Sequence, residues 1–396
     1  MNRIVIQRSK AFFSKPFFHD QRTILALWML LSVVAMVLKL NRSDNNFRIF
    51  RGVFWHTIEG LPLYEAYPAE YFDINHYGPF FSIVIAPFAV MPVWLGLLFW
   101  NIALSLTLYF AISRSGFQYG QKLFLFWFCS ETLLTSLFMQ QFNITIAAII
   151  IASFFLIEKE RDFWAAFLII LGTLIKLYGV VGLAFLLFSR HKIRFTLSLL
   201  FWALVLFAAP MLISSPQYIM QQYAEWVACL GGKNVETILS IAQNISALGM
   251  VRRITGNVTY SDLWLILPAL FIFFLPYLRI KQYKNAAFRQ TLLASVLLFV
   301  VLFSTGSESS SYIIALSGVC IWYFSVPWKR GKADVLLMIF VFLLSSMGSS
   351  DLYPREFKRE VIQQYALKAL PCLIVWLRLC YEMMTKNYAE KIEQTH

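Results

Sequence analysis

Long, unbroken apolar runs constrain the fold of this chain more than any other feature of its sequence. The first extends from Thr23 to Leu40, and runs of similar character recur along most of the remaining chain. Crossing a bilayer takes about 20 apolar residues in a helix, and only helices and closed barrels can span it. The runs are continuous and rich in Leu, Ile and Phe rather than alternating, so they predict helices and not barrel strands.

The composition agrees with a membrane protein. Hydrophobic residues make up 59% of the 396 residues and charged residues 14%, whereas soluble domains carry roughly a quarter charged residues. We therefore predict an all-α polytopic integral membrane protein, with residues 1–396 as one transmembrane domain. The five cysteines show no metal-ligand or disulfide spacing, and we expect no metal and no other cofactor.

Loop charges predict the topology. The net charge of +13 is spread over short loops between apolar runs, a pattern that reports orientation and attraction to membrane lipids rather than nucleic-acid binding. Basic clusters mark cytoplasmic loops, and they predict about twelve crossings with both termini in the cytoplasm. The Pro-interrupted residues 79–92 are predicted to re-enter the membrane without crossing it. Residues 163–189 are predicted to form two crossings, or alternatively one bent helix.

Long loops are predicted on the outer face, at residues 41–78, 214–262 and 349–365. In the first, apolar Phe47, Phe50, Phe54 and Ile58 recur at spacings of three, four and four. That spacing places one apolar stripe on a helix, with arginines on the opposite side. An amphipathic helix of this kind lies in the membrane interface, so we predict an interfacial helix in the first outer loop.

Polar side chains interrupt the apolar runs on this same predicted face. Gln141 and Asn143 stand in the turn QQFN, where they either bind a ligand or cap a helix. Lys176 is isolated in LIKLYGVV, where it either meets an anion such as a lipid phosphate or extends to the interface. The paired Arg252 and Arg253 suit a phosphate, and equally lipid headgroups.

Acidic and aromatic residues gather in two of the outer segments. Asp73 and His76 lie in the aromatic-rich stretch YFDINHYGPFF, and Glu308 lies in the serine-rich turn STGSESSSY. Carboxylates near aromatic rings suit sugar recognition, although an ordinary polar loop would look similar. Because acids, amides and cations converge on one membrane face, they favour chemistry on a lipid-linked substrate that carries phosphate.

Short motifs in a fixed order carry a family resemblance that covers roughly residues 25–325. They are NNF at 45–47, GLPLY at 60–64, HYGPFF at 76–81, QFN at 141–143, IK at 175–176 and STGSESSSY at 304–312. In this order the chain resembles the GT-C superfamily of polyprenol-phosphate-sugar-dependent glycosyltransferases, and most closely glycosyltransferase family 87.

The resemblance implies a GT-C-like fold and the transfer of a single sugar, mannose by analogy, from a polyprenyl-phosphate donor. The acceptor would be a hydroxyl of a glycan or glycolipid at the periplasmic face of the inner (plasma) membrane, and the configuration would invert. Asn46 stands where the family carries its catalytic aspartate, and an amide cannot take up the acceptor's proton. Asp44, Asp73 and Glu308 are the candidate bases, unless the activity is altered or lost.

The same resemblance implies roles in substrate binding for nine residues. They are Asn46, His76, Tyr77, Gln141, Asn143, Lys176, Arg252, Arg253 and Tyr312. Lys176 and one or both of the two arginines would hold the leaving phosphate and stabilise its developing charge. Two alternatives remain open, namely a lipid or glycan transporter (a flippase), and a ligase or polymerase of lipid-linked glycans.

Overall fold

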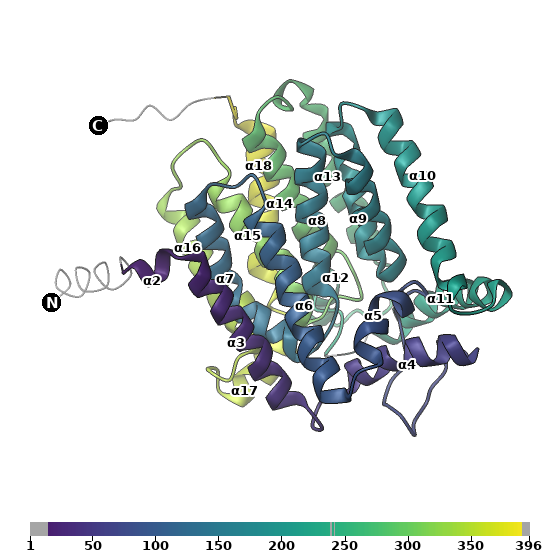
Figure 1. Ribbon diagram of the computed structural model, residues 1–396. Coiled ribbons are helices and arrows are strands. Elements are labelled where there is room, and N and C mark those ends of the chain that lie inside the picture. The colour runs from purple at the N-terminus through teal and green to yellow at the C-terminus, as the bar shows by residue number, and fades with distance from the viewer. Residues whose placement is uncertain (1–14, 238–239, 241, 390–396) are drawn as a thin grey trace.

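The computed structural model describes residues 15–237, 240 and 242–389, and every regular element in these ranges is a helix. Most of the helices run side by side as one bundle, and α4 and α11 lie across its lower end (Figure 1). The predicted all-helical fold is therefore confirmed.

The helices have the following bounds in chain order. The first half contains α2 (Pro16–His19), α3 (Gln21–Lys39), α4 (Asn45–Glu59), α5 (Phe81–Ala89), α6 (Val93–Ser113), α7 (Tyr119–Phe138), α8 (Asn143–Glu158), α9 (Asp162–Ile175) and η1 (Leu177–Phe188). Next come α10 (Lys192–Ala208), η2 (Ala209–Leu212), α11 (Pro216–Thr237), α12 (Ala247–Thr255), α13 (Leu263–Phe274), η3 (Leu275–Leu278) and η4 (Ile280–Gln282). The last are α14 (Ala286–Leu302), η5 (Ser309–Ser311), α15 (Tyr312–Phe324), α16 (Lys332–Phe340), η6 (Val341–Ser346), η7 (Met347–Ser349), α17 (Arg355–Phe357), η8 (Lys358–Gln363) and α18 (Ala369–Thr385).

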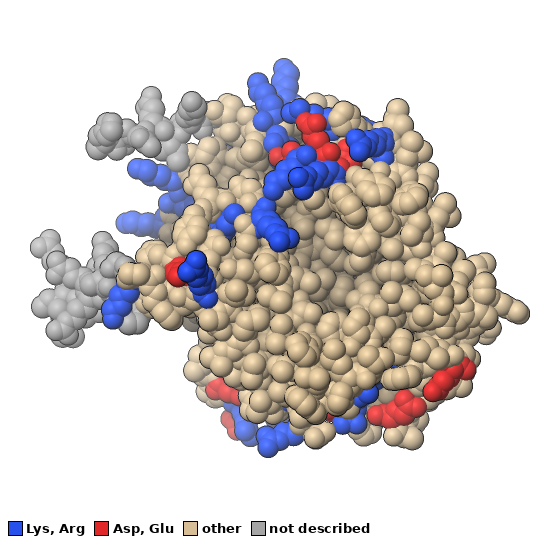
Figure 2. All heavy atoms as spheres, in the orientation of Figure 1, with Lys and Arg blue, Asp and Glu red and all other residues tan. Residues whose placement is uncertain are grey.

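The apolar helices identify a membrane protein. Among the described residues, four helices are long and apolar enough to cross a bilayer: Gln21–Lys39, Val93–Ser113, Lys192–Leu212 and Lys332–Ser349. Six shorter apolar helices of 10–17 residues accompany them. Charged side chains collect towards the two ends of the molecule and leave an uncharged belt between them (Figure 2). The count of about twelve crossings stays a prediction.

Residues 162–188 form two elements rather than one bent helix. The backbone is extended at Lys176, between α9 and η1, with φ −144° and ψ 120°. The two elements then fold against each other so closely that a Cβ atom on Gly179 would lie 2.3 Å from the carbonyl carbon of Gly172. This hairpin has Lys176 at its tip, where the N–H of Gly78 also donates to the carbonyl of Ile175 at 3.0 Å.

Helix α4 lies against the turn between α7 and α8, which fixes its first residues. The side chain of Gln140 accepts from the N–H of Phe47 and donates to the carbonyl of Ser43, both at 3.0 Å. Phe47 is fully buried, whereas Ile58 near the other end of α4 is 46% exposed. Helix α5 follows, and at nine residues it is about 14 Å long, too short to span a hydrocarbon core of about 30 Å.

Candidate active site

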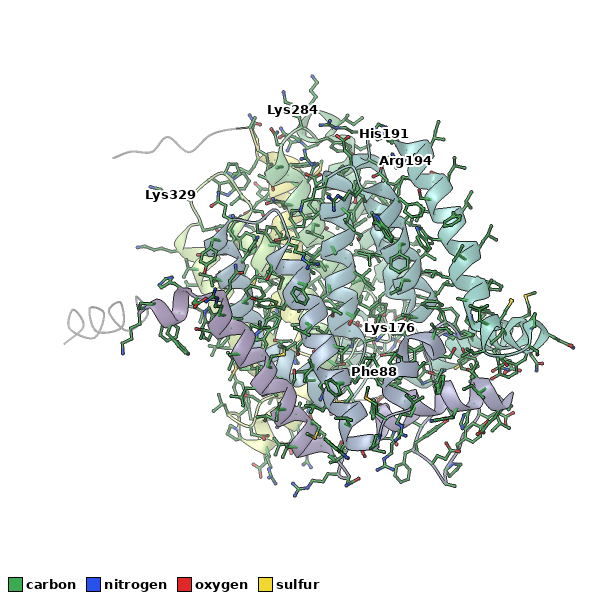
Figure 3. The ribbon with its side chains drawn as sticks, viewed as in Figure 1. Phe88, Lys176, His191, Arg194, Lys284 and Lys329 are labelled. Carbon is green, nitrogen blue, oxygen red and sulfur yellow. The ribbon has the colours of Figure 1, made fainter. Side chains whose placement is uncertain are left out.

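A cavity of about 330 Å³ opens where several chain segments meet at one end of the bundle. Figure 3 shows Lys176, one of its lining residues, on the part of the bundle away from Lys284, His191 and Arg194. Polar side chains from six segments line it: Asn46, Asp73, His76, Tyr77, Gln141, Lys176, Tyr178, Gln243, Ser304, Thr305 and Glu308. Seven of these are residues that the sequence predicted for the site.

A continuous line of hydrogen bonds crosses this site from a cation to an acid. Lys176 donates from Nζ to Oδ1 of Asn143 at 2.7 Å, and Asn143 donates from Nδ2 to Oε1 of Gln141 at 2.9 Å. Gln141 in turn donates from Nε2 to Oε2 of Glu308 at 2.7 Å. Every donor points towards Glu308, an order that suits a charged ammonium at one end and an ionised carboxylate at the other.

The turn that carries Glu308 is held from several sides. The N–H of Glu308 donates to the hydroxyl of Ser311, and the N–H of Ser311 donates to the carbonyl of Glu308 at 2.9 Å. Ser310 reaches Oε1 of Gln141 at 3.0 Å, which ties the turn to the start of α8. The carboxylate therefore has a fixed position in the cavity wall.

Aromatic rings surround Lys176. Its Nζ lies 4.9 Å from the ring centroid of Tyr178 and 5.8 Å from that of Tyr77, distances at which a ring face attracts a cation. The hydroxyls of Tyr178 and Ser304 form a hydrogen bond of 2.8 Å. Burial raises the pKa of Tyr77 above its ordinary value, so its phenol stays neutral while its oxygen accepts from the N–H of Phe142. Lys176 therefore brings a cation to the cavity, with the neutral hydroxyls of Tyr77 and Tyr178 beside it.

The rim of the cavity holds a second acid beside a histidine. Asp73 has a positive φ of 74°, and its carboxylate lies 3.9 Å from Nε2 of His76. The carbonyl of His76 accepts from the indole N–H of Trp226 at 3.0 Å. The side chain of Asp73 is 58% exposed, so this acid lies at the opening of the cavity rather than in its wall.

Asn46, which by the sequence resemblance is expected to align with the family's catalytic aspartate, also lines the cavity. Its Nδ2 donates to the carbonyl of Met139 at 2.8 Å. The neighbouring candidate Asp44 does not line the cavity. It precedes α4, with its carboxylate bound by Nε and Nη2 of Arg48, each at 3.1 Å. The contacts with Arg48, in the first turn of α4, therefore give this acid a structural role.

The paired arginines are directed elsewhere, which corrects the expectation that they face the phosphate. Arg252 is 2% exposed, lies against the ring of Tyr260 and forms an ion pair with Asp262 at 3.1 Å. Arg253 donates to the backbone carbonyls of Ser240, Gln243 and Gln363. Because Gln243 lines the cavity, Arg253 supports the wall without contacting its interior.

Two further predicted residues lie behind the cavity. Asn143 is fully buried and acts as the link between Lys176 and Gln141. Tyr312 is also fully buried, and its hydroxyl donates to the carbonyl of Ile245 at 3.0 Å. No group of three His, Cys, Asp or Glu side chains that could hold a metal ion occurs among residues 15–237, 240 and 242–389.

Sequence reasoning missed several lining residues. Tyr178, Trp226 and Gln243 all border the cavity, as does Ser304, which the sequence identified only as the first residue of the motif STGSESSSY. Tyr178 lies two positions after Lys176, and this closeness in sequence could have identified it as a site residue. Trp226 and Gln243 lie in the long 214–262 segment, whose path over the cavity depends on packing and not on any local pattern.

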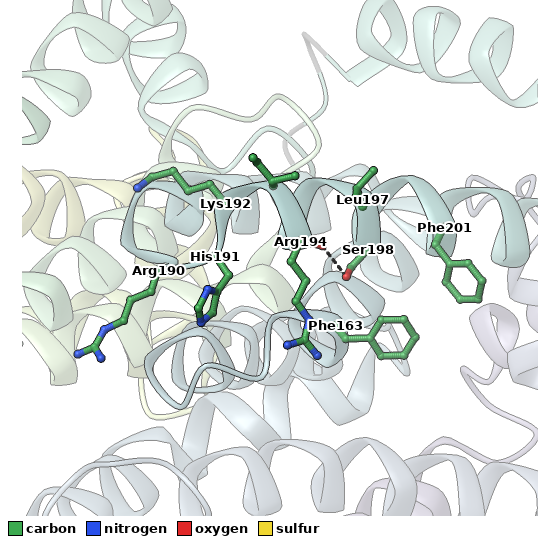
Figure 4. A pocket seen from close by; sticks show the side chains of 9 residues that line it. Phe163, Arg190, His191, Lys192, Arg194, Leu197, Ser198 and Phe201 are labelled. Carbon is green, nitrogen blue, oxygen red and sulfur yellow. Dashed lines mark hydrogen bonds between the residues drawn. The ribbon is translucent and has the colours of Figure 1, made fainter.

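A second cavity of about 790 Å³ lies at the opposite end of the molecule, against the start of α10. Figure 4 shows its basic side chains, of which Arg194 points towards Phe163. Arg190 lies 2.8 Å and His191 3.8 Å from Glu160, so these two already meet an acid. The described residues that line this second cavity include no carboxylate beside an amide, the arrangement that Glu308 and Gln141 form in the first cavity. The two sites therefore differ chemically.

Comparison with known proteins assigns the chain to a family. No protein with a curated description matches it. The sequence model of glycosyltransferase family 87 matches residues 75–305, which is more than half of the chain. This range includes Gln141 and Lys176 and begins two residues after Asp73. It extends from the segment beside the cavity rim to the turn that precedes Glu308. The chain therefore belongs to glycosyltransferase family 87.

Proposed function

We propose that this protein transfers a single sugar from a polyprenyl-phosphate donor to a hydroxyl of a glycan or glycolipid, with inversion. The observation that carries the proposal is the line of side chains from Lys176 to Glu308 in one cavity. In this proposal Lys176 is the cation that binds the phosphate and Glu308 is the proton acceptor, at the two ends of that line. Membership of a glycosyltransferase family favours this enzyme over a transporter or flippase.

Glu308 is the base that we assign. As the acceptor oxygen attacks the anomeric carbon, the carboxylate takes the hydroxyl proton and the bond from that carbon to the phosphate oxygen breaks. Gln141 holds Oε2 at 2.7 Å, and we assign Oε1 to the acceptor hydroxyl. Attack from the side opposite the leaving phosphate inverts the configuration. Asp73, at the exposed rim, is the alternative base.

Lys176 would hold the phosphate. When the sugar leaves, the polyprenyl phosphate gains negative charge, and a fixed cation stabilises that charge without reorganising. The contact with Asn143 and the rings of Tyr77 and Tyr178 set the position of Nζ before any ligand binds. Tyr178 supplies a neutral hydroxyl close by, in contact with Ser304.

The sugar would lie between the phosphate pocket and the rim. Trp226 and His76 offer ring faces there, and Asn46 and Asp73 offer groups that hydrogen-bond to hydroxyls. Following the family resemblance, we propose mannose as the sugar. A pocket of about 330 Å³ suits one sugar with its phosphate more readily than a whole oligosaccharide, which argues against the ligase alternative.

The distribution of charge supports the proposed membrane face. Basic loops favour the cytoplasmic side, and the cavity lies at the end away from Lys284 and Arg194 (Figure 3). We therefore place the reaction on the periplasmic face of the inner (plasma) membrane, where membrane lipids surround the bundle and the donor arrives within the bilayer.

The test is transfer by the purified, reconstituted protein. Synthetic polyprenyl-phosphate mannose with a labelled sugar is supplied together with a membrane extract as the source of acceptor. We expect labelled glycan or glycolipid and an equal amount of released polyprenyl phosphate, and about 10²–10⁴-fold slower formation of both from Glu308→Gln. If no polyprenyl-phosphate sugar reacts while the same vesicles translocate a labelled lipid, the transporter alternative replaces the proposal.

A further inference from the structure

A third hollow, elongated in shape, lies on the side of the bundle, between α6, α8 and α9, and has a volume of about 600 Å³. Its walls are apolar for most of their length, from Trp100 and Phe142 at one end to Phe110 and Leu156 near the other. Figure 2 shows the uncharged face of the molecule hollowed beneath a group of basic side chains. We name this hollow the lateral groove.

Three cations lie at one end of the lateral groove. They are Arg114 after α6, Lys159 after α8 and Arg161 before α9. The guanidinium of Arg114 lies 5.0 Å from the ring centroid of Phe110, which keeps it over the apolar wall. Lys159 donates to the carbonyl of Arg114 at 3.1 Å, so the two side chains share one small area.

The acids that could neutralise these cations are engaged elsewhere. Glu158 is bound by Arg289 at 2.6 Å, and Glu160 by Arg190 at 2.8 Å. Asp162 is buried and accepts from the hydroxyl of Ser189 at 3.0 Å. Over the described ranges, Arg114, Lys159 and Arg161 form no ion pair, so positive charge accumulates at the mouth of the groove.

The groove has the length of a lipid chain. From Trp100 to Arg114 helix α6 rises about 21 Å, at about 1.5 Å per residue. One leaflet contributes about half of a hydrocarbon core of about 30 Å, so a whole acyl chain fits along the wall. The charged end lies on the side of the molecule where the basic loops gather.

We propose that the lateral groove binds an anionic phospholipid from the leaflet on the basic side of the molecule. Its phosphate lies among Arg114, Lys159 and Arg161, and one acyl chain follows the apolar wall towards Trp100. Charge complementarity selects this occupant, because a neutral hydrocarbon would leave the three cations without a partner. The site is separate from the cavity that contains Lys176 and Glu308, and the proposal does not depend on the proposed reaction.

The test measures binding of dioleoyl phosphatidylglycerol to the full-length protein in neutral detergent, by native mass spectrometry. Dioleoyl phosphatidylcholine and free glycerol phosphate serve as ligands that lack the net charge and the chains, respectively. Each cation near a lipid headgroup contributes about fivefold in affinity, so removing all three should weaken binding on the order of 100-fold. We expect that loss in Arg114→Gln/Lys159→Gln/Arg161→Gln.

A matched variant, Lys281→Gln/Lys284→Gln/Lys332→Gln, removes the same charge from exposed positions outside the groove and should keep the wild-type affinity. If the first triple variant does not fold, Arg161→Gln alone should still lose about fivefold, since this exposed side chain can be changed without a buried contact. Equal loss in both triple variants would overturn the proposal. So would unchanged affinity in the groove variants, or equally tight binding of phosphatidylcholine or glycerol phosphate.

Discussion

Lys176 and Glu308 lie at opposite ends of one hydrogen-bonded line, although they belong to different turns of the chain. Lys176 donates to Asn143 and Gln141 donates to Glu308, each at 2.7 Å, and the two amides are joined at 2.9 Å. The line couples the position of the cation to that of the acid. Substitution of either Lys176 or Glu308 should therefore alter both substrate binding and proton transfer.

Replacement of the candidate base tests its assignment directly. Glu308→Gln keeps the shape and the contact with Gln141 but removes the proton acceptor, so kcat should fall about 10²–10⁴-fold. The measurement is the initial rate of sugar transfer at equal amounts of folded protein. Asp73→Asn is the matched control and should keep most of the rate, because Asp73 is exposed at the rim. The reverse ranking would move the base to Asp73.

The lysine is tested through donor saturation. Lys176→Ala should lower kcat/KM about 10²–10³-fold, because a fixed cation aimed at the leaving phosphate is lost. The measurement is the rate over a series of donor concentrations. Lys281→Ala, an exposed lysine in η4 outside the cavity, should leave the curve unchanged. Unaltered donor saturation in Lys176→Ala would mean that the side chain only extends towards the membrane surface.

Asp44 should matter for stability and not for chemistry. Its carboxylate accepts from Arg48 and from the N–H of Asn41, so Asp44→Asn should lower the free energy of unfolding by about 1 kcal/mol. The estimate is modest because the side chain of Arg48 is 40% exposed. Thermal unfolding in detergent measures the loss, and the rate per folded molecule should persist. A large fall in rate at unchanged stability would instead identify Asp44 as the base.

Close packing of the hairpin behind Lys176 offers a further test. A Cβ atom at Gly179 would meet backbone atoms of Gly172 and Thr173 at 2.3 Å, so Gly179→Ala must separate η1 from α9. Overpacking of this kind costs about 1–3 kcal/mol, and it should also displace Lys176 and weaken donor binding. The midpoint of thermal unfolding and the donor KM check both effects. Gly120→Ala meets open space and should change neither quantity.

Much of the architecture followed from local patterns in the sequence. Continuous apolar runs predict membrane helices because an unsatisfied backbone is too costly inside a bilayer. The isolated Lys176 marked a helix junction, and the structure has an extended residue there between α9 and η1. Gln141 could be predicted as a site residue because a polar side chain beside apolar helices needs a partner. The break between two apolar runs also predicts that Gln141 lies at a helix end.

Only the tertiary structure decided which of these groups meet. Asp44 and Glu308 were equivalent candidates in the sequence. In the structure Asp44 forms an ion pair with Arg48, whereas Glu308 lines the cavity. Arg252 and Arg253 looked suited to phosphate, but an acid and backbone carbonyls satisfy them. The physical reason is that the helical period and the hydropathy of a run determine on which face of a helix a residue lies and how deep in the membrane it lies. The partner of a polar side chain is set by long-range packing between segments that no local pattern relates.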